Sequence, residues 1–169
     1  MRITTHKQWL IVSAIAAATC ALYVAGMGDS LVGMDVPLYS RVLYSSTYLG
    51  TAFDLLLDFK GTIVSGYYAP LSSISLMLDK IPTWSEVPNP RVTMAINTIF
   101  HCVNGLLVFA LLTRLGVTFR VALLTCGLFL IHPIQVPSVL WFSQRKTLMA
   151  VTFYLVAYLL YDRHREKGS

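Results

Sequence analysis

The chain has 169 residues, of which 56% are hydrophobic and 12% are charged. Soluble domains carry about 25% charged residues, so this composition, with a mean hydropathy of +0.64, predicts an integral membrane protein with membrane lipids as partners. The formal net charge of +5 falls mostly at the ends of apolar runs. It therefore indicates membrane orientation rather than nucleic acid binding. Cys20, Cys102 and Cys126 lie inside apolar runs, without the spacing of a metal site.

Four apolar runs predict transmembrane helices, because a bilayer needs about 20 mostly apolar residues per helix. The runs cover residues 9–27, 92–113, 121–140 and 147–161. The first predicts an uncleaved span rather than a signal peptide, since it is long for a signal core and lacks a clear small-residue cleavage site. The third is interrupted at His132-Pro133 and again at Pro137.

These runs predict an all-α, multi-pass membrane protein with a single domain over residues 1–169. The basic residues at the span ends form three clusters, listed in chain order: Arg2, Lys7, Arg114, Arg120, Arg163, Arg165 and Lys167. We expect these clusters, both termini and the basic tail 162–169 to be cytoplasmic, because positive charge is retained on that side.

The segment 28–91 is then an outer loop, and it carries six acidic residues against four basic ones. It is rich in tyrosine and leucine, unlike a disordered linker. Its parts 37–59 and 71–80 predict short amphipathic helices in the plane of the lipid head groups.

The adjacent cations Arg145 and Lys146 fall on the same outer side, where positive charge is normally depleted. A basic pair in that place predicts binding of a phosphate or another anionic head group. Generic attraction to anionic lipids is the alternative.

A polar stripe marks the second apolar run. Asn97, His101 and Asn104 are spaced i, i+4, i+7 and so lie on one helix face. Because polar groups are costly in hydrocarbon, we expect them to face protein or a water-filled cavity. Hydrogen bonding between helices is one alternative. Another is a haem or pigment ligand at His101, with His132 as a second axial ligand.

In this order, the pieces resemble the N-terminal membrane portion of the GT-C glycosyltransferases, above all the transmembrane and tetratricopeptide-repeat O-mannosyltransferases and their bacterial relatives. The family's Tyr-Arg-Pro-Leu element reads Tyr68-Ala69-Pro70-Leu71 here, and its Asn-x3-His-x2-Asn pattern is matched by the polar stripe. Its series of His-Pro, Trp and Arg-Lys is matched by His132-Pro133, Trp141 and Arg145-Lys146. Two departures are Ala69 in place of the family's arginine and the absence of a repeat period.

The resemblance implies sugar transfer from a polyprenyl-phosphate carrier at the outer face, with the lipid-linked sugar as substrate. No cofactor is predicted, and the acids of the outer loop form no ligand set with the spacing of a metal site. Such transfer needs a carboxylate as general base and cations at the departing phosphate. By position, the resemblance assigns the base to Asp35, with Asp29 as the alternative, and phosphate binding to Arg145 and Lys146. It further implies a cavity lined by Asn97, His101, Asn104, Tyr68, His132 and Trp141.

The family's membrane domain has more spans than the four predicted here, so we do not expect this chain to catalyse alone. The main alternative is a non-catalytic subunit or scaffold whose apolar faces contact protein partners in a larger membrane complex. The expected location is the bacterial inner membrane.

Overall fold

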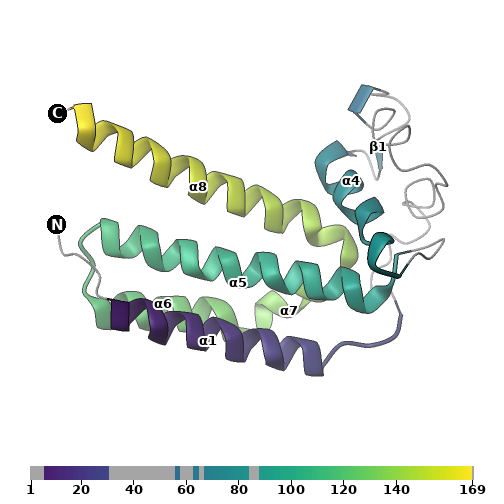
Figure 1. Ribbon diagram of the computed structural model, residues 1–169, viewed down its shortest axis with the longest axis horizontal. Helices are drawn as coiled ribbons and strands as arrows, with labels where there is room; N and C mark the ends of the chain where they lie inside the picture. The colour runs from purple at the N-terminus through teal and green to yellow at the C-terminus, as the bar shows by residue number, and fades with distance from the viewer. Residues whose placement is uncertain (1–5, 31–55, 58–62, 65–66, 84–87, 169) are drawn as a thin grey trace.

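The computed structural model describes residues 6–30, 56–57, 63–64, 67–83 and 88–168. Four long helices dominate it, α1 (His6–Ala25), α5 (Pro90–Arg114), α6 (Phe119–Ile131) and α8 (Arg145–Gly168), as Figure 1 shows. The shorter elements are β1 (Ile63–Val64), β2 (Tyr67–Tyr68), α4 (Pro70–Leu78), η2 (Ile81–Thr83), η3 (Pro133–Gln135), α7 (Val136–Leu140) and η4 (Phe142–Gln144). The predicted helical class is confirmed.

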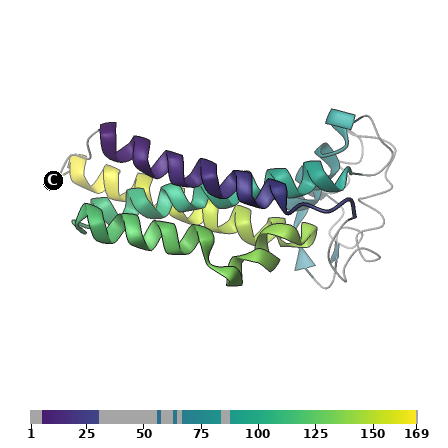
Figure 2. The ribbon, with the colours of Figure 1, turned by 90° about the horizontal axis from the view of Figure 1, so that it is seen from below.

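The long helices run alongside one another, and α5 contacts α1, α6 and α8. The turned view of Figure 2 shows the same arrangement. The start of α1, the turn between α5 and α6, and the end of α8 all lie at one end of the molecule, with α4 at the opposite end (Figure 1). The described residues of the three basic clusters therefore lie at one end, and the Arg145-Lys146 pair lies at the other.

Local sequence sets the bounds of α5. Asn89 caps its first turn, because the side-chain Oδ1 accepts hydrogen bonds from the N–H groups of Arg91 and Val92 at 3.0 and 3.4 Å. At the other end Gly116 has a φ of 80°, a conformation that glycine adopts without strain. The N–H of Val117 bonds to the carbonyl of Leu112, which completes a Schellman-type stop.

An apolar core lies between α1, α5 and α6, and its buried members are Val12, Ala16, Phe109, Ala122, Cys126 and Leu130. Trp9 and Phe119 both meet Phe109 edge to face, with ring centroids 5.2 and 6.1 Å away. Gly105 lets α6 approach α5 closely, since a Cβ at this position would lie 2.5 Å from Leu130 Cδ2. Small residues at such contacts are typical of helices that associate within a bilayer.

Two helices, α1 and α5, are long and apolar enough to cross a membrane. The pair formed by α6 and the segment Pro133–Leu140, bent by 48°, makes a third if it counts as one span. The structure does not confirm a fourth span or the cytoplasmic side of the termini. The apolar run 147–161 of α8 is shorter than about 20 residues, with charged residues before and after it.

The predicted interruption at His132-Pro133 is confirmed. Helix α6 ends at Ile131, and the chain passes through η3, α7 and η4 before α8 begins at Arg145. His132 caps η3, because its Nδ1 accepts the N–H of Ile134 at 3.2 Å. The break places the start of α8 beside α4.

The segment 28–91 contains a helix close to one of the two that were predicted there. Helix α4 follows the Tyr68-Ala69-Pro70 break, close to the predicted helix 71–80, with Pro70 in its first turn. The antiparallel pair of β1 and β2 was not predicted. Most of the predicted helical segment 37–59 lies outside the described residues.

Candidate functional site

Arg145 is the centre of a buried polar network at the start of α8. Its side chain is 0% exposed. Nε donates to Oδ1 of Asn97 at 2.6 Å, and Nη2 donates to the backbone carbonyl of Thr93 at 2.9 Å. Nη1 donates to Oγ of Ser75 at 2.8 Å. A guanidinium has five N–H donors, and two more of them reach a carboxylate.

That carboxylate belongs to Asp79, whose side chain is 1% exposed. Arg145 Nη1 and Nη2 donate to its two oxygens at 3.0 and 2.8 Å, which makes a bidentate ion pair. Ser75 and Asp79 are four residues apart, so both project from one face of α4 and its end. With five donors committed to protein acceptors, the Arg145 guanidinium has none left for a phosphate in this structure.

The polar stripe of α5 makes hydrogen bonds to other segments of the bundle. Asn97, His101 and Asn104 are at most 1% exposed. Nδ2 of Asn97 donates to the carbonyls of Val139 and Trp141, at 3.0 and 3.1 Å. These bonds agree with the alternative expected for the stripe, hydrogen bonding between segments, while the cavity lining stays a prediction.

His101 and Asn104 act in the same way on other segments. Nε2 of His101 lies 3.0 Å from the carbonyl of Leu130 and carries the proton, because a carbonyl only accepts. Nδ2 of Asn104 donates to the carbonyl of Leu148 at 3.0 Å, and the Thr152 hydroxyl donates to Asn104 Oδ1 at 2.7 Å. The Leu130 carbonyl lies in the last turn of α6, and carbonyls at a helix end need such partners where water is excluded.

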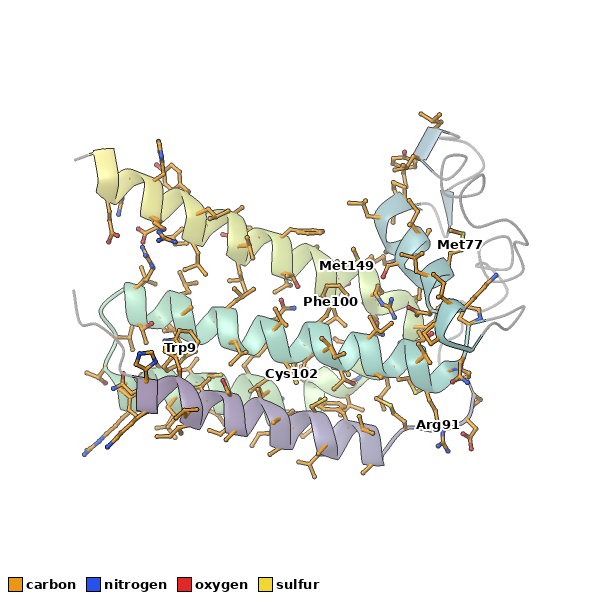
Figure 3. The ribbon with its side chains drawn as sticks, in the orientation of Figure 1. Trp9, Met77, Arg91, Phe100, Cys102 and Met149 are labelled. Carbon is orange, nitrogen blue, oxygen red and sulfur yellow. The ribbon has the colours of Figure 1, made fainter. Side chains whose placement is uncertain are left out.

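Lys146, unlike its neighbour, lies at an open groove of about 260 Å³ between α8 and the start of α4. One wall is formed by residues 68–72 and the other by Lys146, Met149, Ala150 and Phe153 of α8. Figure 3 shows Met149 on the stretch of α8 that approaches α4. The structure thus brings together two pieces that the sequence singled out separately, the Tyr68-Ala69-Pro70-Leu71 element and the second cation of the basic pair.

The remaining predicted residues lie apart from this groove or outside the description. Asp35 is outside the described residues. Asp29 is exposed and pairs with Arg91, its Oδ1 2.7 Å from Nε. Trp141 is half-buried, and its backbone carbonyl accepts a hydrogen bond from Asn97. His132 is exposed.

Tyr68 borders the groove, and its hydroxyl donates to the carbonyl of Leu56 at 2.7 Å.

Lys80, next to Asp79, is 1% exposed, and its burial lowers the pKa of its ammonium group. At the opposite end of the bundle, Arg114 pairs with Asp162 and Glu166 at 3.0 and 3.2 Å, so part of that basic cluster is neutralised.

Both histidines make contacts within the protein. The ring of His101 stacks on Phe129, with centroids 5.1 Å apart, and meets Tyr23 edge to face at 5.7 Å. Its Nε2 is occupied by Leu130, and His132 caps a helix. Within the described ranges, no group of three or more His, Cys, Asp or Glu residues has the geometry of a metal site.

Sequence reasoning missed Asp79, which it counted only as one of the loop acids. Arg145 and Lys146 differ in burial because they lie on different faces of α8. Arg145, Leu148 and Leu155 form its buried face, whereas Lys146, Met149 and Phe153 border the groove. Neighbouring helical positions point about 100° apart, so an adjacent pair of cations rarely shares one ligand.

Comparisons with known proteins support the resemblance drawn from the motifs. The chain is 30% identical over 161 residues to the protein O-mannosyl-transferase TMTC3 of Mus musculus, covering 92% of this chain. It is 34% identical over 121 residues to the protein O-mannosyl-transferase Tmtc1 of Drosophila melanogaster, covering 66% of this chain. The chain spans only 17% and 14% of the lengths of these relatives.

No family model matches the chain, and no solved structure matches it. Both relatives come from animals, so they give no support to a bacterial inner membrane. The membrane class, the helices and the order of motifs agree with these relatives. This chain is therefore similar to part of the transmembrane O-mannosyltransferases, members of the GT-C superfamily of membrane glycosyltransferases.

Proposed function

We propose that this chain forms part of a GT-C-type glycosyltransferase and binds a lipid-linked phosphate in the groove between α4 and α8. The observation that carries the proposal is the meeting of Lys146 with the Tyr68-Ala69-Pro70-Leu71 element in one groove. The similarity to O-mannosyltransferases supports the superfamily. The similarity does not identify the ligand, which follows from the chemistry of the groove.

The α8 wall of the groove is amphipathic along the helix. Lys146, Met149, Ala150 and Phe153 are spaced i, i+3, i+4, i+7 and so follow one face. The cation stands at the outer start of α8, and the apolar side chains extend from it over about 10 Å at the helical rise. A ligand with an anionic head and a long hydrocarbon tail would place its head at the cation and its tail along the apolar side chains.

The opposite wall adds a second attraction for an anion. The first turn of α4 borders the groove and contains no acidic residue. Backbone N–H groups at a helix start and the helix dipole favour negative charge there. A phosphate between Lys146 and this turn would have its polyprenyl chain along Met149, Ala150 and Phe153.

Lys146 substitutions test this proposal. We expect Lys146→Gln to weaken binding of polyprenyl phosphate to the protein in nanodiscs by at least about tenfold, since a bond to a charged group contributes about 1.5–3 kcal/mol. Lys146→Arg keeps the charge and should retain most of the binding. Lys7→Gln, an exposed lysine at the opposite end, is the matched control.

Two probes separate the phosphate from the rest of the ligand. Polyprenol, which lacks the phosphate, should bind weakly to the native protein and should not respond to Lys146→Gln. Nanodiscs rich in phosphatidylglycerol test generic anion attraction. If phosphatidylglycerol competes as well as polyprenyl phosphate, or if Lys146→Gln changes nothing, the proposed ligand is wrong.

Catalysis in the larger protein or assembly would need a general base, and by position we propose Asp35. Asp35→Asn should abolish glycan transfer while leaving expression and polyprenyl phosphate binding intact, because the base acts on the acceptor hydroxyl. Asp29→Asn, beside Arg91, is the comparison. Full transfer activity in Asp35→Asn would remove Asp35 from this role.

A second candidate is a non-catalytic membrane subunit, favoured by the exposed apolar face of α8. Phe153, Tyr154, Leu160 and Tyr161 are all more than half exposed. Native mass spectrometry after gentle solubilisation should then give one defined complex. A monomer with transferase activity would contradict this candidate.

A further inference from the structure

The two walls of the groove come from parts of the chain far apart in sequence, so something must fix their spacing. One wall is the stretch 68–72, and the other is the first two turns of α8. The Arg145 network lies beside them: Ser75 and Asp79 belong to α4 and its end, and Arg145 directly precedes Lys146. The inference below rests on the proposed function of this groove.

Arg145 ties together three elements through side chains that are removed from solvent. Three acceptor atoms, Ser75 Oγ and the two carboxylate oxygens of Asp79, belong to α4 and its end. The other two, the Thr93 carbonyl and Asn97 Oδ1, belong to α5. Asn97 in turn donates to the carbonyls of Val139 and Trp141, just before α8 begins. The planar guanidinium reaches all five acceptor atoms in only one arrangement of α4, α5 and α8. A lysine at this position could not reproduce that arrangement.

The same bonds keep Arg145 from meeting the ligand directly. Its side chain is 0% exposed, and its donors are used within the protein. Lys146 borders the groove instead. The network therefore acts on the ligand only through the position of other groups.

We propose that Arg145 is a positioning residue, and that its ion pair with Asp79 holds α4 against the start of α8 to set the shape of the groove at Lys146. The pair fixes the end of α4, and the first turn of that helix forms the opposite wall. Loss of either partner leaves a buried charge without compensation, which releases α4 and widens the groove.

Hydrogen exchange of the α4 amides, residues 70–79, measures this effect without any ligand. Asp79→Asn and Arg145→Gln should each raise α4 exchange rates by about a hundredfold, while α5 amides change less. The double variant Asp79→Asn/Arg145→Gln leaves no unpaired charge, and its two amides can still bond to each other. Its α4 exchange should return to within about tenfold of the native chain. Asp162→Asn, which breaks the ion pair with Arg114 at the other end, is the control and should leave α4 unchanged.

Polyprenyl phosphate binding in nanodiscs is the second readout on the same variants. Each single variant should weaken binding by about tenfold or more, and the double variant should recover it together with α4 protection. Recovery of α4 protection without recovery of binding would overturn the proposal, because it would mean that Arg145 contacts the phosphate itself. Losses that simply add in the double variant would also overturn it. If Lys146→Gln leaves both α4 exchange and binding unchanged, the proposed function fails while the exchange data still decide the role of the Arg145–Asp79 pair.

Discussion

The two ends of α5 are held by opposite kinds of contact. Toward the end with the basic clusters, α5 packs apolar side chains against α1 and α6, with Phe109 between Trp9 and Phe119. Toward the α4 end, Asn97 and the Thr93 carbonyl bind the Arg145 network. Unbroken helices satisfy their own backbone and can pack on apolar surface alone. Where the chain between α6 and α8 is not helical, carbonyls lose the N–H partners of a helix, and polar side chains must donate hydrogen bonds to them instead.

Both ends stabilise the bundle, but only one of them borders the groove. The apolar end resembles the packing that holds any small helical membrane bundle together. The polar end is the one that places Lys146 and α4 beside a groove. Four substitutions test this difference between the two ends of α5, in order of decreasing expected loss of stability.

Arg145→Leu should have the largest effect. It leaves the buried carboxylate of Asp79 without its partner, and removal of one member of a buried pair costs about 3–5 kcal/mol. Chemical unfolding in detergent micelles measures the loss. Arg163→Leu, which removes an exposed arginine at the other end of α8, should change stability little. A similar loss in both variants would show that the network is not special.

Gly105→Ala probes the apolar end and should be destabilising by about 1–3 kcal/mol, because the new methyl group meets the buried Leu130. Gly127→Ala is the matched control, since nothing lies within 4 Å of an added Cβ there. That variant should be neutral or stabilising, given the helix propensity of alanine. Thermal denaturation of the two proteins side by side decides the matter, and equal melting temperatures would contradict the close contact of α5 and α6.

Asn104→Ala should have a smaller effect, about 1 kcal/mol, as is typical of hydrogen bonds between helices in membranes. A double-mutant cycle with Thr152→Val isolates the bond between Thr152 and Asn104 Oδ1. We expect a coupling energy of a few tenths of a kcal/mol or more. Strict additivity would mean that the two side chains do not interact.

Asp162→Asn should have the smallest effect. Its carboxylate pairs with Arg114, which also contacts Glu166 at the partly exposed end of the bundle. Such pairs contribute little and are screened by salt. Unfolding measured at low and high salt should show a small difference that shrinks as salt is added. A large, salt-independent loss would place this pair in the same class as the Arg145 network.

Several local features were predictable because their causes are local. The break at His132-Pro133 follows from the proline, which cannot continue a helix, and the helix after Tyr68-Ala69-Pro70 follows from proline in a first turn. The common face of Asn97, His101 and Asn104 follows from helical spacing. The motif order was specific enough to identify the superfamily that the comparisons then supported.

Composition, proline and helical period act within a few residues, so the sequence was enough to predict the membrane class, the apolar helices and the break at His132-Pro133. The burial of Arg145 against Asp79, 66 positions away, and the place of Lys146 at the groove instead depend on how distant helices pack. The direction of each side chain depends on the rotation of α8 against α4 and α5. That rotation is fixed by hydrogen bonds between distant segments, so no local pattern reveals which cation of an adjacent pair turns inward.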